Sequence, residues 1–162
     1  MPIHPFFNTV TDTIYSLPLA IFYVTEGCNL GCITCSYRDK LPDELSIDEI
    51  ETLAGQLHTL GLRRIVFSGG EPLLRRDFID ICRVFQKYSI KQSLLTNGVL
   101  LGKRIDDIAP FLDEIIISLD GANAATHDTI RGVRSFDLII ENVRAVRQKY
   151  PAIPTSLRTV IQ

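Results

Sequence analysis

The chain of 162 residues has no tryptophan, one methionine, three histidines and little net charge. Its 17 Lys and Arg residues against 19 Asp and Glu residues give −2, which argues against a nucleic-acid site built on clustered positive charge. No apolar run reaches the ~18 residues of a membrane-spanning helix. Residues 1–16 lack the basic and apolar regions of a signal peptide. We therefore expect a cytoplasmic protein with no nucleic-acid partner and no membrane partner.

The length also excludes a complete eight-stranded α/β barrel, which needs ~250 residues. A composition of 46% hydrophobic and 22% charged residues excludes disordered and collagen-like chains. The sequence contains no internal repeat and no low-complexity segment. We expect one domain over residues 19–162, preceded by a lead-in over residues 1–18 that has little periodicity.

Strand-like and helix-like segments alternate along the chain. β-branched and aromatic residues predict strands at 19–25, 64–68, 91–96, 114–120 and 156–162. Apolar residues three and four positions apart predict helices within 46–61, 77–88, 103–112 and 135–150. The first of these helices has a capping box at Ser46 and Glu49 and a stop at Gly61. The alternation predicts an α/β fold with about five parallel strands and right-handed crossovers.

Polar residues follow the predicted strands at the point where each one ends. Residues 68–71 close the second strand, residues 96–98 close the third, and Ser118 and Asp120 close the fourth. Parallel α/β folds bind their ligands at the carboxyl ends of the strands. In the fourth strand, Ser118 and Asp120 share one face, while the opposite face is wholly apolar. We expect the apolar face to meet helices and the polar face to point into a concave lumen.

The four cysteines are unevenly placed, with Cys28, Cys32 and Cys35 close together and Cys82 far away. Cytoplasmic chains rarely use a disulfide framework. Three thiolates on a short loop suit an iron–sulfur cluster with one iron left open. A structural zinc site needs a fourth ligand, either Cys82 or a histidine. A dithiol at Cys32 and Cys35 leaves Cys28 unexplained. The cluster is the favoured interpretation, and zinc and dithiol chemistry stay open.

These motifs together resemble the radical S-adenosylmethionine (radical SAM) superfamily. The resemblance rests on CNLGCITC, GGEP, TNG and SLDG, which follow the first four predicted strands in that order. The stretches THDTIRG and SFDLIIENV are similar to the branch that modifies peptides and related metabolites. The resemblance covers about residues 19–162. It implies a partial TIM-like (βα) barrel, truncated relative to the six-unit core of the family.

The resemblance also implies roles for individual residues. Cys28, Cys32 and Cys35 would hold a 4Fe–4S cluster, whose fourth iron binds the amino and carboxylate groups of S-adenosyl-L-methionine (AdoMet). Gly69, Gly70 and Glu71 match the motif that contacts the AdoMet amino group. Glycines allow the backbone to approach a ligand closely, and a carboxylate or a carbonyl complements an ammonium. The other cofactor-binding candidates are Asn97, Ser118 and Asp120, with Arg131 for the AdoMet carboxylate and Val160 and Ile161 for the adenine. No catalytic residue is assigned.

The implied function is reductive cleavage of AdoMet by an electron from a low-potential donor of the ferredoxin or flavodoxin type. The resulting 5′-deoxyadenosyl radical abstracts hydrogen from a substrate, either a peptide or a small metabolite. The alternatives are a non-catalytic metal-binding module and a dithiol oxidoreductase. We interpret Cys82 as a buried core thiol, His58 as a surface residue, and His127 as part of a helix start.

Overall fold

A computed structural model describes residues 7–10, 13–35 and 44–160, and these residues form one five-stranded parallel sheet. The strands lie in sequence order: β1 (Leu19–Thr25), β2 (Arg64–Gly69), β3 (Lys91–Thr96), β4 (Glu114–Ser118) and β5 (Thr155–Arg158). Every neighbouring pair is parallel. The predicted fold class, a partial α/β barrel with five parallel strands, is confirmed.

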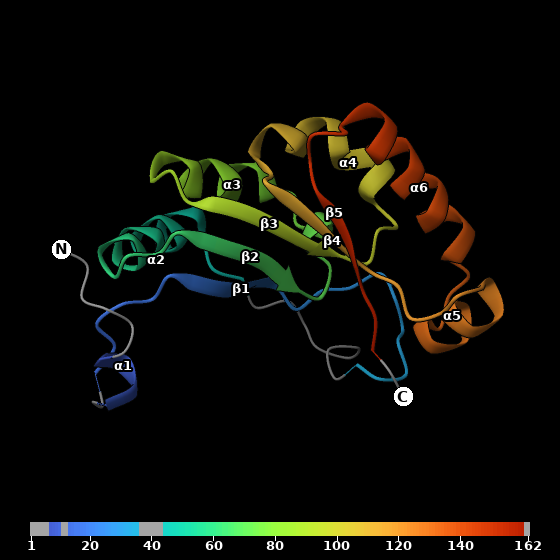
Figure 1. Ribbon diagram of the computed structural model, residues 1–162, viewed down its shortest axis with the longest axis horizontal. Coiled ribbons are helices and arrows are strands. Elements are labelled where there is room, and N and C mark those ends of the chain that lie inside the picture. Colours follow the sequence, from blue (N-terminus) through green and yellow to red (C-terminus); the bar gives the residue numbers. More distant parts are fainter. Residues whose placement is uncertain (1–6, 11–12, 36–43, 161–162) are drawn as a thin grey trace.

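Helices connect the strands, and Figure 1 shows α3, α4 and α6 along one side of the curved sheet. The helices are α1 (Phe7–Val10), α2 (Ile47–Thr59), α3 (Phe78–Lys87), α4 (Leu101–Ile108), α5 (Ala124–Arg131) and α6 (Phe136–Lys149), with 3₁₀ turns η1 (Pro72–Leu74) and η2 (Ala109–Phe111). The predicted capping box of α2 is confirmed, because the Glu49 amide donates to Ser46 Oγ at 3.3 Å and the Ser46 amide donates to Glu49 Oε2 at 2.8 Å.

The core lies between these helices and one face of the sheet. Phe67 of β2 packs edge-on against Phe78 and Phe85 of α3, and all three side chains are fully buried. Ile115 and Ile117 of β4 are also fully buried, as their period-two spacing predicts. The alternate apolar residues of the predicted strand therefore form the buried face of the sheet.

The other face of the sheet is much more open. Leu19, Ile21 and Tyr23 of β1 lie on that face and are 50%, 60% and 56% exposed. Near the amino ends of the strands, Arg64 Nη1 donates to Ser93 Oγ at 2.8 Å and pairs with Glu114 Oε2 at 3.1 Å. This polar contact joins β2, β3 and β4 at the amino edge of the sheet. Ligands of parallel α/β folds bind at the opposite, carboxyl edge.

Three predicted boundaries are wrong. The fifth strand ends at Arg158 because the Val160 amide donates to the Asp120 carboxylate at 3.0 Å and leaves the sheet ladder. The segment that contains Asp120 follows directly after β4, which ends at Ser118. The helix predicted at 103–112 begins at Leu101 and gives way to η2, because Pro110 has no amide proton to continue it.

The lead-in contains α1, which the sequence did not predict. Asn8 accepts hydrogen bonds through Oδ1 from the amides of Tyr15 and Ser16 at 2.8 and 3.2 Å. The Leu17 amide then donates to Leu60 at the end of α2 at 2.8 Å. Hydrogen bonds between a side chain and nearby backbone amides require no periodic pattern of apolar residues, so the apolar spacing did not reveal this part of the lead-in.

Candidate functional site at the carboxyl edge of the sheet

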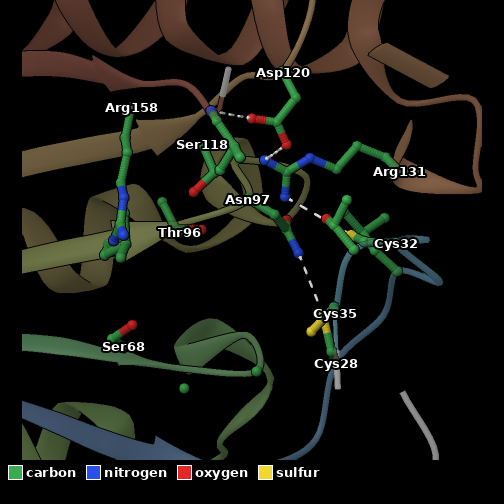
Figure 2. A pocket seen from close by; sticks show the side chains of 16 residues that line it. Cys28, Cys32, Cys35, Ser68, Thr96, Asn97, Ser118, Asp120, Arg131 and Arg158 are labelled. Carbon is green, nitrogen blue, oxygen red and sulfur yellow. Dashed lines mark hydrogen bonds and ion pairs between the residues drawn. The ribbon is translucent and has the colours of Figure 1, made fainter. Parts of the chain in front are cut away.

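A cavity of about 190 Å³ lies at the carboxyl ends of the strands, and Figure 2 shows the side chains that line it. All the predicted site residues except Glu71 line this cavity, namely Cys28, Cys32, Cys35, Gly69, Gly70, Asn97, Ser118, Asp120 and Arg131. Val160 lines it as well, whereas Ile161 lies outside the described residues. Residues up to 132 positions apart in the chain, from Cys28 to Val160, are thus brought together.

The three cysteines follow β1 on a loop. The Cys35 amide donates to the Cys32 carbonyl at 3.2 Å, and the Ile33 amide donates to Ile130 at the end of α5 at 3.0 Å. Cys28 and Cys32 are half-buried and Cys35 is exposed. Burial raises the pKa of the Cys28 thiol, and the negative charges of Glu71, Cys32 and Cys35 raise it further. All three cysteines line the same cavity.

The Gly69-Gly70 turn packs directly on the stem of the cysteine loop. The Gly70 amide donates to the Thr25 carbonyl, and the next amide donates to the Gly27 carbonyl, both at 2.8 Å. A Cβ atom on Gly69 would lie 2.2 Å from the Thr25 oxygen, and one on Gly70 would lie 2.1 Å from the Gly27 oxygen. Gly69 also has a φ of +118°. From the sequence, we expected these glycines to let the backbone approach a ligand. In the structure they also let the β2 turn pack against the backbone of the cysteine loop.

Glu71 does not line the cavity, although Gly69 and Gly70 of the same motif do. Its side chain is fully buried. Oε1 accepts from Thr96 Oγ1 at 2.8 Å and from the Leu73 amide at 3.1 Å, while Oε2 accepts from the Asn97 amide at 2.8 Å. Burial raises the pKa of this carboxyl, although the three hydrogen bonds oppose the effect. The carboxylate therefore ties the end of β2 to the end of β3.

Asn97 carries that connection to the cysteine loop. Its Oδ1 accepts from the Val99 amide at 3.0 Å, which fixes the orientation of the side chain. Its Nδ2 then donates to Asn29 Oδ1 at 2.8 Å and lies 4.0 Å from Cys28 Sγ. Asn97 therefore stabilises the turn and also contacts the cysteine loop.

Arg131 and Asp120 form a nearly buried ion pair on the other side of the cysteines (Figure 2). Arg131 Nη2 lies 2.6 Å from Asp120 Oδ2, with side chains 12% and 7% exposed. Arg131 Nη1 lies 3.8 Å from Cys32 Sγ. Gly132 ends α5 in the left-handed region with φ +72°, and an added Cβ would lie 2.5 Å from the Gly31 oxygen. The end of α5 therefore packs against the cysteine loop.

His127 supports this corner and is fully buried, as a structural residue of the helix. Its Nδ1 accepts from the Asp120 amide at 3.2 Å, so we assign its proton to Nε2. Its ring packs edge-on against Phe136. Burial lowers the pKa of His127, and the nearby Arg131 lowers it further.

This pKa shift predicts a loss of stability on acidification. The unfolded histidine takes up a proton below its ordinary pKa of ~6.5, before the folded one does, so the free energy of unfolding falls as the pH drops through that value. One proton contributes at most ~1.4 kcal/mol per pH unit. We expect urea unfolding between pH 7.5 and 5.5 to show a smaller loss in His127→Asn than in the wild type. Equal losses would contradict the prediction.

Two further residues line the cavity: Thr96, which the sequence placed at a strand end without a role of its own, and Arg158, which the sequence did not single out. Thr96 Oγ1 donates to Glu71 and accepts from the Gly98 amide at 3.0 Å. Arg158 pairs in register with Ser118. The period-two pattern of the fourth strand, continued into the fifth, could have placed Arg158 on the cavity side.

The donor set fits an iron–sulfur cluster better than a mononuclear site. Among the described ranges, no three His, Cys, Asp or Glu side chains are arranged to hold a single metal ion. A 4Fe–4S cube binds each thiolate through a different iron, so its ligands need not converge on one point. Cys82, the candidate fourth ligand of a zinc site, is fully buried in the core, where its pKa rises to about 12. It does not line the cavity.

Fold and site together define a partial (βα) barrel in which three cysteines line a cavity at the carboxyl edge of the sheet. The profile of the Radical SAM superfamily matches residues 22–161. The chain therefore belongs to the radical SAM superfamily.

Within the part of the chain that is described, no helix is both long enough and apolar enough to cross a membrane.

Several curated relatives support this membership. The chain is 33% identical over 136 residues to the AdoMet-dependent heme synthase of Methanosarcina barkeri, which covers 80% of this chain and 39% of that protein. It is 36% identical over 135 residues to the GTP 3′,8-cyclase of Synechocystis, which covers 78% of this chain and 41% of that protein. The chain thus spans about two fifths of the length of these relatives.

Solved structures show the same fold at lower identity. Streptococcus suis SuiB bound to the precursor peptide SuiA has a TM-score of 0.79 at 21% identity, over 92% of this chain and 34% of SuiB. Native anSMEcpe with bound AdoMet and the Cp18Cys peptide has a TM-score of 0.67 at 22% identity, over 87% of this chain and 42% of that one.

Proposed function

We propose that this chain binds a 4Fe–4S cluster through Cys28, Cys32 and Cys35 and binds AdoMet beside it. The observation that carries the proposal is the gathering of the three thiols and the strand-end residues around one cavity. When bound, this pair of cofactors supplies reductive cleavage of AdoMet to methionine and a 5′-deoxyadenosyl radical, which takes a hydrogen atom from the substrate. The protein orients the reacting groups and limits side reactions.

The residues divide into those that contact AdoMet and those that position them. We assign contacts to the Gly69-Gly70 backbone, Ser118 and Arg131, because each lines the cavity beside the cysteines. Asp120 pairs with Arg131 and so fixes the direction in which the guanidinium offers its remaining N–H groups to a carboxylate. We assign Glu71 an indirect role, since it holds Thr96 and Asn97 in place.

The substrate and the electron donor belong to the same proposal. We propose a peptide or a small metabolite as the substrate and a ferredoxin- or flavodoxin-type protein as the electron donor. Ile21 and Tyr23 are exposed on the open face of the sheet, and we propose that the substrate approaches the cavity across this face. The SuiB structure, which contains a precursor peptide, supports a peptide through similarity of fold alone.

An electron paramagnetic resonance titration tests the AdoMet site. We expect AdoMet to change the spectrum of the reduced cluster, because it would occupy the open iron. Arg131→Lys should need about tenfold more AdoMet for the same change, the loss of ~1.4 kcal/mol expected when a planar fork is replaced by a point charge. Arg134→Lys, at an exposed position close in sequence, is the matched control.

Two results would contradict this assignment. An unchanged spectrum in the wild type would remove AdoMet from the site, and identical titrations of both variants would remove Arg131. Formation of 5′-deoxyadenosine under reducing conditions separates an enzyme from the alternative of a non-catalytic metal-binding module.

A further inference from the structure

Arg75 is a buried charged residue that lies outside the cavity. Its side chain is 3% exposed, and it follows η1 in the segment that connects β2 to α3. Its Nε and Nη2 donate to the Asp77 carboxylate at 2.7 and 3.1 Å. A buried guanidinium needs partners for its donors because it cannot lose its proton. Asp77 supplies the charge, and Arg75 in turn lowers the pKa of the Asp77 carboxyl.

The remaining hydrogen bonds of Arg75 reach two backbone carbonyls that are far apart in sequence. Nη1 donates to the Val24 carbonyl at 2.7 Å, and Nη2 donates to the Leu45 carbonyl. Val24 lies in β1 just before the cysteine loop, and Leu45 lies just before the cap of α2. Glu44, next to Leu45, places Oε2 3.8 Å from Nε. One guanidinium therefore joins both ends of the segment that carries the three cysteines.

The carbonyl of Val24 is available because the sheet ladder shifts at this point. The register pairs Tyr23 with Ser68 and Thr25 with Gly69, so Val24 has no partner of its own on β2. A buried carbonyl without a hydrogen bond costs free energy, and Arg75 removes that cost. The register shift in β1 therefore leaves the Val24 carbonyl without a partner on β2, and the buried Arg75 donates a hydrogen bond to it.

We propose that Arg75 is a positioning residue that closes the base of the cysteine loop and orders it before the cluster binds. Joining the ends of a loop removes part of the entropy that would otherwise be lost on binding. A lysine at this position keeps the charge, but its single compact ammonium cannot hold two separate carbonyls and a carboxylate in the same planar arrangement. The link to cluster binding rests on the proposed function, whereas the ordering of the loop does not.

Hydrogen exchange of the iron-free protein tests the closure itself. We expect Arg75→Lys to speed exchange at least tenfold at the amides of Ile33, Cys35, Gly70 and Glu71, which lie in the loop or bond to its stem. The ladder amides of β3 and β4 should keep their wild-type rates. Arg76→Lys is the matched control, because Arg76 is the adjacent arginine and is exposed. It should match the wild type at every amide.

Iron retention tests the consequence for the site. After reconstitution, we expect Arg75→Lys to lose iron to a chelator about tenfold faster than Arg76→Lys. If Arg75→Lys does not fold, Asp77→Asn replaces it, because that change removes the nearer of its two carboxylate partners and should loosen the same amides.

Three outcomes would overturn the proposal. Uniform acceleration of exchange across the sheet would make Arg75 a general stability residue, and unchanged loop amides would show that it orders nothing. Faster exchange of the loop amides without faster loss of iron would show that order in the loop does not affect retention of the cluster. Absence of iron from the wild type would instead refute the proposed function, while the exchange result would stand by itself.

Discussion

Alanine at Cys28, Cys32 or Cys35 is expected to abolish iron binding, while Cys82→Ala is expected to retain it. Anaerobic reconstitution should give about four irons per wild-type chain, as a cubic cluster requires. Each of the three cavity thiols would hold one corner of the cube, and among the described residues no other cysteine lines the cavity. Iron analysis and the visible absorption spectrum measure the outcome.

Cys82 makes a demanding control because it is also a cysteine. It is buried in α3 and forms part of the core. Cys82→Ala should cost ~1 kcal/mol of stability through a small cavity, without any effect on iron content. If Cys82→Ala folds normally and yet binds no iron, the three-ligand assignment is wrong and a closed four-ligand site takes its place.

Gly70→Ala is expected to have the second large effect, although it removes no ligand. The new Cβ would lie 2.1 Å from the Gly27 oxygen and 2.8 Å from the Glu26 oxygen, and both are backbone atoms that cannot rotate away. Separating the two segments would break the hydrogen bond from Gly70 to Thr25. We expect a loss of about 3 kcal/mol of unfolding free energy, the upper part of the usual range for overpacking. Iron loading should fall with it.

Gly55→Ala in α2 is the matched control for this substitution. There the new Cβ would meet the Tyr88 hydroxyl at 3.3 Å, which is the far end of a side chain. Alanine also favours a helix interior over glycine by up to ~1 kcal/mol, so stability should stay the same or rise. Urea unfolding of both variants measures the difference. Equal stability of the two would show that the β2 turn can move away from the cysteine loop without cost.

Several features were determined by the sequence alone. The period-two spacing of Ile115 and Ile117 identified the buried face of β4, because a strand places alternate residues on opposite sides. The Ser46 and Glu49 pair identified the start of α2, since both partners lie within one helical turn. In each case the interacting atoms are close in the chain, so local geometry was sufficient.

Only the tertiary structure decided how the strand ends meet. Glu71 faces Thr96 and Asn97 rather than the cavity, because the register and twist of β2 against β3 set the direction of its side chain. Arg75 reaches Val24 and Leu45 because the ladder shifts within β1. These contacts join residues 20 or more positions apart, and their geometry depends on how the whole sheet packs. A motif in the sequence can name the residues of a site, but the distances between their atoms are fixed only when the strands that carry them are assembled.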